Sequence, residues 1–430
     1  MSNREAAFLK QNGLDVEGID REALLAVFEE EMDAGLAGRP SSLMMIPSFI
    51  TIDRPVKTGT PVVVLDAGGT NLRAAVVTIS AAGKAQIGAF SKSVMPGTQG
   101  EIDAETFFDA FADFVAPIAD QADSIGFCFS YPAEITPDCD ARLIRWSKQI
   151  QAPSVVGQMI GSGLQKHLAQ RGYERRVVIL NDTVATLLAG KSAGVARDYS
   201  AYVGFILGTG TNTAYVERNA RITKRTDLDP AGSMVINVES GAFRRVRQSL
   251  FDKVMDAATN DCGHYSFEKM ISGAYLGWLG FVVLGEAVKA NFFSSAAAAK
   301  ITEWKTVSSK HLDDFCGGTP VPDNPFSDAA FSAADRETAV RLCTPVYERA
   351  AVLTAVNLAS AILKTGAGQD PARAVCVNVD GSTYHLTRTA QFQARVQREL
   401  QRLLAPRGIA YELICLEDSP VIGAAVAGLM

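Results

Sequence analysis

Two short segments rich in glycine and threonine could bind phosphate groups. Asp66-Ala-Gly-Gly-Thr70 follows the β-branched run Pro61–Leu65, and Gly208-Thr-Gly-Thr-Asn212 follows the apolar run Tyr202–Leu207. Glycine lets the backbone approach an anion and take a positive φ, so that successive N–H groups point into one concavity. Asp66 could orient water molecules around a magnesium ion. An ordinary hairpin needs the same residues, so neither turn alone predicts a site.

A carboxylate at another strand end could act as a general base. Arg175–Leu180 predicts a short buried strand and Thr183–Ala189 a helix, so Asn181 and Asp182 lie at their junction. Asp182 could cap the helix, or it could take a proton from a substrate hydroxyl, and composition does not decide between the two. Polar residues elsewhere would suit a polyol: Ser130, Lys148, Asn212, Glu239 and Glu268.

The elements around both turns exclude the common nucleotide-binding loops. Leu72–Ile79 and Thr213–Glu217, which follow the turns, have strand character. Neither segment is a G-x-G-x-x-G opening a helix or a G-x-x-x-x-G-K-[ST] loop. The same strand–turn–strand unit therefore occurs twice at about the spacing of one domain. We expect a duplication that gives two similar lobes with a small-molecule site in the cleft between them.

The first unit continues in a recognisable order. A third strand follows the turn Ala81–Lys84, a helix carries Phe107 and Phe111, and Ser124–Phe129 is a further buried strand, which gives βββαβ. In the second half, Ala374–Val377 leads into Asn378-Val-Asp-Gly-Ser382. This third strand-to-turn element either packs on a nucleoside or is a simple type I turn.

Composition limits the class of protein. The chain has 430 residues, 47% of them hydrophobic, which predicts two or three folded domains. Its net charge is −6 and like charges do not cluster, so we expect neither nucleic acid nor a membrane surface as partner. The longest apolar run, Ala274–Gly285, is too short to span a membrane and predicts a buried helix.

Cysteine usage and the start of the chain suggest a compartment. The seven cysteines are scattered and the four histidines isolated, which favours reduced thiols over disulfides or a zinc site. The first ten residues lack the apolar core of a secretory signal. We therefore expect a cytoplasmic protein.

Taken together and in order, the motifs resemble those of hexokinases of the glucokinase and yeast hexokinase type. The likeness spans roughly residues 20 to 430. The matching segments are Leu65–Arg73 and Gly208–Asn212 (phosphate motifs), Gly126–Pro132, Arg145–Lys148, Val238–Phe243 and Phe267–Lys269 (sugar contacts), Leu180–Val184 (catalytic segment) and Val379–Ser382 (adenosine motif).

The resemblance implies an α/β fold of two ribonuclease-H-like lobes with a central cleft, the actin-like ATPase (sugar kinase) superfold. We expect a small lobe of residues 60–196 with 417–430 and a large lobe of residues 1–59 with 197–416. The implied activity is ATP-dependent transfer of the γ-phosphoryl group to the 6-hydroxyl of a hexose, with cleft closure. Glucose is the first candidate, fructose and mannose the next, and the chain would act as a monomer or homodimer.

Residue roles carry over with the motifs. Asp182 would be the general base, and Lys148 would add positive charge near the transferring phosphoryl group. The residues implied to hold the sugar are Ser130, Ser147, Lys148, Asn181, Asp182, Asn212, Glu239 and Glu268. Those implied to bind ATP and Mg²⁺ are Asp66 (the metal, through water), Gly68, Gly69, Thr70, Asn71, Arg73, Gly208, Thr209, Gly210, Gly381 and Ser382.

Three positions depart from the family's pattern. Ser147 replaces the usual threonine, which we expect to matter little. Ser240 replaces a common tryptophan after the sugar-binding Glu239, which leaves sugar preference open. Tyr347 replaces a small hydroxyl residue beside adenine. Its ring either stacks on the base, which would weaken discrimination between ATP and GTP, or turns toward solvent or core.

Two other classes of protein share such a fold, because fold alone does not fix function. One is a sugar-responsive regulator that binds hexose without useful turnover, and the other is a chaperone-like or filament-forming ATPase. Asp182, Lys148 and the two phosphate turns favour an enzyme over a pure binder, and the polyol-binding residues disfavour the second class.

Overall fold

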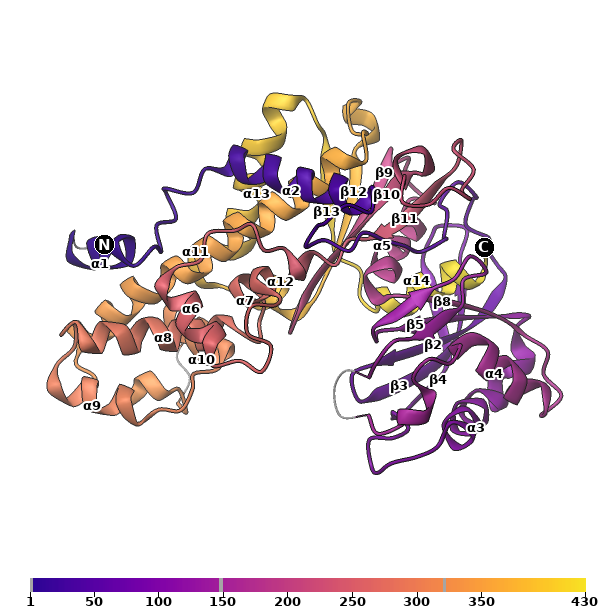
Figure 1. The fold of residues 1–430 in the computed structure, drawn as a ribbon, viewed down its shortest axis with the longest axis horizontal. Helices are drawn as coiled ribbons and strands as arrows, with labels where there is room; N and C mark the ends of the chain where they lie inside the picture. The colour runs from indigo at the N-terminus through magenta and orange to yellow at the C-terminus, as the bar shows by residue number, and fades with distance from the viewer. Residues whose placement is uncertain (1–2, 147–149, 320–321) are drawn as a thin grey trace.

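Two β-sheets, each with its own helices, form the two lobes of the computed structural model, which describes residues 3–146, 150–319 and 322–430 (Figure 1). The five-stranded sheet has the order β4-β3-β2-β5-β8, and the six-stranded sheet has the order β1-β11-β10-β9-β12-β13. The first consists of β2 (Pro61–Gly68), β3 (Asn71–Ile79), β4 (Ala85–Val94), β5 (Ser124–Phe129) and β8 (Arg176–Leu180). The second consists of β1 (Ile46–Pro47), β9 (Ala201–Leu207), β10 (Thr211–Arg218), β11 (Ser233–Asn237), β12 (Val375–Asp380) and β13 (Tyr411–Ile414).

The two sheets repeat one topology. In the first, β4, β3 and β2 are antiparallel and β2, β5 and β8 are parallel. In the second, β11, β10 and β9 are antiparallel and β9, β12 and β13 are parallel, with β1 added at the edge. The predicted order βββαβ and the predicted two ribonuclease-H-like lobes are confirmed. The central strands are buried on both faces, which explains their continuous β-branched and apolar runs.

Helices of the small lobe cover both faces of the five-stranded sheet. They are α3 (Ala104–Val115), α4 (Ile160–Ala169), α5 (Asp182–Ala193) and the C-terminal α14 (Ser419–Gly428). The helix α3 buries Phe107, Phe108 and Phe111, which pack with Phe127 of β5 in one apolar cluster. A short pair of strands, β6 (Ala133–Ile135) and β7 (Ala141–Leu143), lies beside the cleft.

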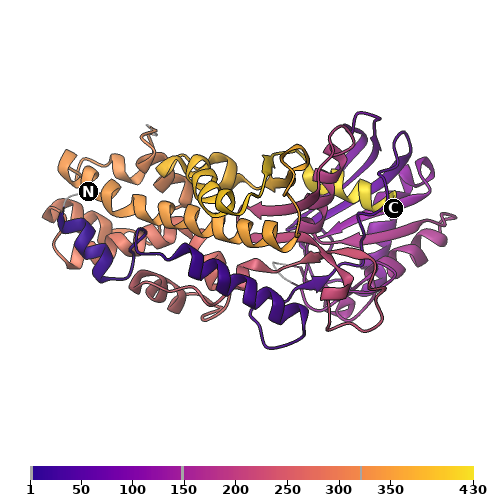
Figure 2. The ribbon, with the colours of Figure 1, turned by 90° about the horizontal axis from the view of Figure 1, so that it is seen from above.

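Most of the remaining helices belong to the large lobe, which extends away from the cleft toward the N-terminus (Figures 1 and 2). They are α1 (Asn3–Gln11), α2 (Arg21–Leu36), α6 (Leu250–Ala257), α7 (Ser266–Ile271), α8 (Leu276–Lys289), α9 (Ser295–Glu303), α10 (Ser309–Cys316), α11 (Ala333–Lys364), α12 (Ser382–Leu386) and α13 (Phe392–Leu404). The buried helix predicted at Ala274–Gly285 is α8.

The 32-residue helix α11 forms the axis of the large lobe. It begins at a capping box in which Ser332 and Asp335 satisfy each other's backbone N–H groups. By length and composition it could span a membrane, but 89% of its most apolar window is buried inside the protein. It is therefore the core helix of this lobe.

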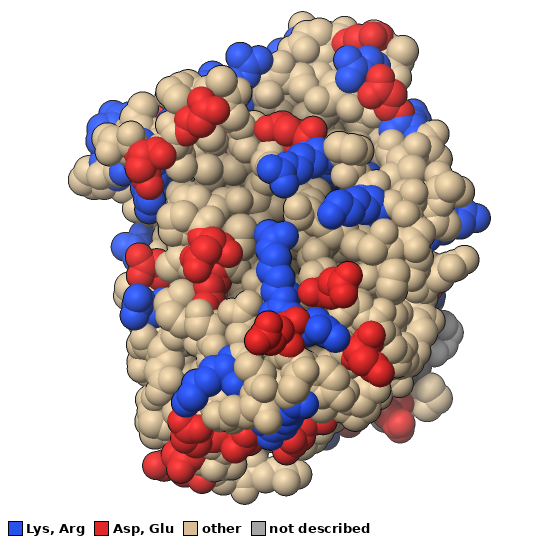
Figure 3. Space-filling view, turned by 90° about the vertical axis from the view of Figure 1, so that its right-hand side faces the viewer, with Lys and Arg blue, Asp and Glu red and all other residues tan. Residues whose placement is uncertain are grey.

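Charged side chains are intermingled over the face formed by the small lobe. Figure 3 shows lysine and arginine side chains next to aspartate and glutamate side chains across this surface. Mixed charge of this kind suits solvent contact rather than binding to a polyanion.

The lobes are joined by α5 and α14, which lie between the sheets (Figure 1). One apolar cluster contains residues of β2, β8, α5 and α14 together with Ala214 and Val235 of the six-stranded sheet. The contact depends on small residues. A Cβ atom on Gly423 would lie 1.8 Å from the carbonyl oxygen of Ala185, and one on Gly126 would lie 1.8 Å from that of Ala424. The two helices and β5 therefore touch through backbone.

We predict that Gly423→Ala destabilises the protein by about 1 to 3 kcal/mol or more, because the added methyl group forces α14 away from α5. Gly285→Ala is the matched control: Gly285 lies within α8, and a Cβ there meets no heavy atom within 4 Å. Removing a helical glycine at such a site should stabilise by up to about 1 kcal/mol. Denaturant unfolding measures the free energy of unfolding of both variants. Equal effects of the two substitutions would contradict a close backbone contact between α14 and α5.

Candidate active site

A cavity of about 820 Å³ lies in the cleft between the lobes. The small lobe lines it with Ser130, Tyr131, Arg145, Asn181 and Asp182, among others. The large lobe contributes its own set, which includes Thr209, Gly210, Thr211, Asn212, Asn237, Glu239, Tyr265, Glu268 and Tyr275. Every described residue that the sequence predicted to hold the sugar lines this one cavity.

Asp182 is the first residue of α5, at the floor of the cavity. The helix is capped by Asn181, whose side chain accepts a hydrogen bond from Thr183 N at 2.8 Å. The interpretation of Asp182 as the cap is therefore wrong. Its carboxylate accepts only a long hydrogen bond from Thr183 Oγ1, at 3.3 Å, among the contacts found in the described part of the chain. Because the positive end of the helix favours an anion, α5 stabilises this carboxylate where it faces the cavity.

Glu239 is held rigidly on the opposite wall. Asn212 Nδ2 and Asn237 Nδ2 donate to its Oε1 at 3.0 and 2.8 Å, and Asn212 Nδ2 also donates to Asn237 Oδ1 at 2.8 Å. The register of β10 on β11 explains the arrangement, since Ala214 pairs with Asn237. Glu239 itself has a φ of 59°, in the left-handed region that non-glycine residues rarely adopt. Strained backbone of this kind gathers at functional sites.

Glu268 projects from α7 toward the second phosphate turn. Its Oε2 accepts a hydrogen bond from Thr211 N at 2.9 Å. The turn fits around this side chain because Gly210 has none of its own: a Cβ there would lie 2.7 Å from Glu268 Oε2. Glu239 and Glu268, distant in sequence, thus face one cavity as predicted.

The first phosphate turn is a tight hairpin. β2 ends at Gly68 and β3 begins at Asn71, and Gly69 takes the positive φ of 67° that such two-residue loops require. Asp66 pairs across the strands with Arg73, and Arg73 Nη1 lies 3.5 Å from Asp66 Oδ2. Gly68 lies beside both Asp66 and Ser130, since a Cβ there would be 3.6 Å from Asp66 Oδ1 and 3.9 Å from Ser130 Oγ.

The second turn packs directly against the third strand-to-turn element. Gly381 has a φ of 110°, and a Cβ there would lie 2.4 Å from the carbonyl carbon of Leu207. Thr383 Oγ1 donates to the carbonyl oxygen of Gly208 at 2.8 Å, and Gly273 N donates to the same atom at 2.8 Å. Only glycine fits this backbone contact. The segment predicted to pack on a nucleoside therefore lies against the segment predicted to bind its phosphates.

Carboxylates dominate the electrostatics of the cleft. Burial raises the pKa of Asp66 to about 6, with Arg73 opposing the shift and the charge of Asp182 adding to it. Burial also raises the pKa values of Glu239 and Asp380 above the ordinary range, and Asp182 contributes to both shifts. Asp182 thus lies within electrostatic reach of three other acidic groups. Such a cluster attracts cations and hydrogen-bond donors.

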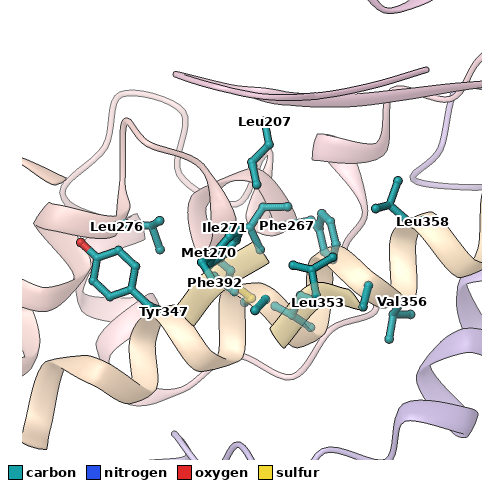
Figure 4. Packing of buried hydrophobic residues seen from close by; sticks show 14 of the residues in the cluster. Leu207, Phe267, Met270, Ile271, Leu276, Tyr347, Leu353, Val356, Leu358 and Phe392 are labelled. Atoms are coloured by element: carbon teal, nitrogen blue, oxygen red, sulfur yellow. The ribbon is translucent and has the colours of Figure 1, made fainter. Parts of the chain in front are cut away.

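Two of the departures noted in the sequence lie away from the cavity. Tyr347 is 1% exposed, its hydroxyl donates to the carbonyl oxygen of Ser309 at 3.1 Å, and Figure 4 shows its ring beside Leu276 among buried apolar residues. The alternative in which Tyr347 stacks on adenine is therefore wrong. The expectation of weak discrimination between ATP and GTP depended on that stacking, so it no longer has a basis. Ser240 is fully buried, 3.1 Å from Thr213 Oγ1, so its side chain points into the core. The predicted residues Ser147 and Lys148 lie outside the described residues.

Some residues of the site were not predicted. Asn237 is the last residue of β11, two positions before Glu239, and a polar residue at the end of a buried strand was the available signal. Asp380 is the last residue of the buried strand β12 and belongs to the Val379–Ser382 motif. No sequence pattern could have predicted Tyr265 as a site residue, because it lies at the end of an irregular loop.

Comparisons with known proteins agree with this geometry. Family models described as hexokinase match residues 8–192 and 202–430. The chain is 30% identical to Hexokinase-7 of Oryza sativa subsp. japonica over 438 residues, which covers 94% of this chain and 92% of the relative. The chain belongs to the hexokinase family. It is a hexose kinase, a phosphotransferase that acts on sugars.

Other similar hexokinases extend the comparison. Hexokinase-2 of Schizosaccharomyces pombe is 28% identical, covering 94% of this chain and 91% of the relative. A hexokinase from Schistosoma mansoni, solved in complex with glucose, is 27% identical with a TM-score of 0.79, covering 99% of this chain and 98% of that one. A second hexokinase structure, at 24% identity and a TM-score of 0.80, covers 99% of both chains and supports the actin-like ATPase fold.

We predict that hexose affinity falls as the pH is lowered and Glu239 becomes protonated. Because burial raises the pKa of Glu239, the fall should begin at a higher pH than the protonation of an exposed glutamate would give. Protonation removes an acceptor for sugar hydroxyls, so the hexose Kd should rise as the pH falls toward this raised pKa. In Glu239→Gln the free energy of hexose binding should be less favourable by roughly 1 to 3 kcal/mol, and the Kd should depend less on pH. Calorimetry from pH 8 to pH 5 measures both, and parallel pH profiles would contradict the assignment.

Proposed function

We propose that this hexokinase transfers the γ-phosphoryl group of ATP to the 6-hydroxyl of a hexose, with Asp182 as the general base. The observation that carries the proposal is the position of Asp182. It is the first residue of α5, it is not used as the cap, and it faces a cavity whose other wall presents Glu239 and Glu268.

The cavity suits a polyol better than an apolar ligand. Glu239, Glu268 and Asn212 offer acceptors and donors that are already oriented by neighbouring groups. Sugar hydroxyls both donate and accept, so they can satisfy carboxylates and amides together. A site whose polar groups are fixed before binding also rejects ligands that lack the matching hydroxyl, because the buried groups would remain unpaired.

In this proposal Asp182 accepts the proton of the 6-hydroxyl as the oxygen forms its bond to phosphorus. The γ-phosphoryl group leaves the β-phosphate oxygen of ATP, and ADP carries away the electron pair of the broken bond. Lys148 and the N–H groups of the Gly208–Gly210 turn would stabilise negative charge on the transferring group. Phosphoryl transfer needs little covalent chemistry from the protein, so positioning supplies most of the acceleration.

The residues of the cleft fit magnesium. The described residues hold no cluster of three His, Cys, Asp or Glu side chains that could hold a metal ion. Asp66 is a buried carboxylate near other acidic groups, and Arg73, at 3.5 Å, is its one ion-pair partner among the described residues, so the excess of negative charge favours a cation. Magnesium typically relies on one or two carboxylates, water and phosphate oxygens. When bound it would neutralise phosphate charge, and Asp66 would hold it through water.

ATP would lie across the two turns and the third element. The Gly69–Thr70 hairpin and the Gly208–Gly210 turn come from the two lobes, and Gly381 and Ser382 adjoin the second turn. Because sugar and nucleotide would contact both lobes, their binding would favour closure about α5 and α14. Closure excludes water, which would otherwise compete with the sugar for the phosphoryl group.

We predict that Asp182→Asn lowers kcat by about 10² to 10⁴, because the 6-hydroxyl loses its proton acceptor. The hexose Kd should change far less, since Glu239 and Glu268 remain. A coupled assay of ADP release gives kcat, and calorimetry gives Kd. A variant that retains near-normal turnover would rule out Asp182 as the base.

A separate prediction concerns closure. Saturating hexose should reduce the radius of gyration in small-angle scattering, and ATP hydrolysis without sugar should be at least about a hundredfold slower than sugar phosphorylation. Unchanged dimensions together with fast sugar-free hydrolysis would instead favour an ATPase of the same fold that does not act on sugar.

A further inference from the structure

A second hollow, of about 610 Å³, adjoins the sugar cavity. Met44, Glu239 and Tyr265 line both hollows, so these three side chains form the boundary between them. What stands at this boundary decides whether a substituent on the bound sugar can extend beyond the first cavity.

Tyr265 is the main barrier of the three. Glu239 is fixed by two asparagine amides and serves the sugar, and Met44 is 56% exposed. Tyr265 carries the largest side chain and is half-buried, with a φ of 53° in the left-handed region. A bulky residue in this region is an outlier that the surrounding structure must impose.

The surrounding structure does impose it. The irregular stretch 258–264 before Tyr265 is tied to α7 by Lys269, a residue that is 2% exposed. Lys269 Nζ lies 2.6 Å from Asp256 Oδ1, 2.8 Å from Asp261 Oδ1 and 2.9 Å from Thr259 Oγ1. These contacts tie the end of α6 and the first part of the loop to α7. Lys269 therefore positions Tyr265 and its own neighbour Glu268 on the same wall.

The ring is also held from the opposite lobe. Arg145 Nη2 donates to the hydroxyl oxygen of Tyr265 at 3.4 Å, across the mouth of the cavity. Arg145 belongs to the small lobe and Tyr265 to the large lobe, so the contact fixes the ring when the cleft is in this arrangement.

The hollow behind the ring is polar. Ser41 and Ser42 line it with their hydroxyls, and both donate to Glu31. On its other side Arg244 Nη2 lies 3.0 Å from His264 Nδ1, while the neighbouring Arg245 is paired with Glu30 and Glu31. Because both serine hydroxyl protons are donated to Glu31, the guanidinium group of Arg244 is the donor that suits the carbonyl oxygen of an acetamido group.

We propose that Tyr265 is a specificity-determining residue that closes the sugar cavity against this hollow and so restricts the acceptor to unsubstituted hexoses. The inference rests on the proposed function, because the sugar must occupy the cavity that Tyr265 borders. Truncating the ring joins the two hollows and admits a sugar that carries an acetamido group.

The test compares kcat/KM for N-acetylglucosamine and N-acetylmannosamine with kcat/KM for glucose. These probes carry the acetamido group on opposite faces of the ring. In Tyr265→Ala the ratio for at least one probe should rise about tenfold or more, the scale of discrimination that pocket shape provides. Tyr265→Phe, which keeps the ring, should leave the ratio near that of the parent.

Tyr275→Ala is the matched control, because Tyr275 lines the sugar cavity but not the second hollow. Its ratio should stay unchanged. If Tyr265→Ala fails to fold, Tyr265→Asn replaces it, since asparagine adopts the left-handed region readily. An unchanged ratio in a folded Tyr265 variant, or an equal rise in Tyr275→Ala, would overturn the inference. A parent enzyme that does not phosphorylate glucose would instead contradict the proposed function.

Discussion

The contact between α5 and α14, sandwiched between two sheets of one topology, is the constraint on which the rest of the structure depends. It requires Gly423 and Gly126, because backbone atoms fill the space that side chains would need. The helix that joins the lobes is also the helix that begins with Asp182. One element therefore connects the lobes and presents the proposed base, so the proposed closure of the cleft would also move this carboxylate.

Electrostatics give the cleft its preference for ligands. Asp66, Asp182, Glu239 and Asp380 come from both lobes and gather within electrostatic reach of one another. Burial is the main reason why the pKa values of Asp66, Glu239 and Asp380 are raised, and the charge of Asp182 adds to each shift. Hydroxyl donors and a phosphate-bound cation would relieve the repulsion between these carboxylates. In the proposed function this repulsion would therefore favour the binding of sugar and MgATP.

Much of this could be predicted from the sequence because short-range rules fixed it. The glycine turns predicted the hairpins, whereas the cross-strand pairing of Asp66 with Arg73 emerged only from the register in the structure. Other features depended on tertiary contacts. Asn181 and Asp182 are both good caps, so only the structure could assign the role to Asn181. Tyr347 could not be oriented because α11 is buried on nearly all sides, and Tyr265 is positioned by ion pairs of Lys269 that no local pattern reveals.

If Asp182 is the general base, the cavity must direct one hydroxyl of the sugar, the 6-hydroxyl, to its carboxylate. The most direct measurement is the position of the phosphoryl group in the product, determined by ³¹P and ¹³C NMR after incubation with glucose, ATP and Mg²⁺. The account predicts that all phosphate is esterified at the oxygen on C6. Phosphate on any other oxygen of glucose, or ADP formed without a sugar phosphate, would contradict it.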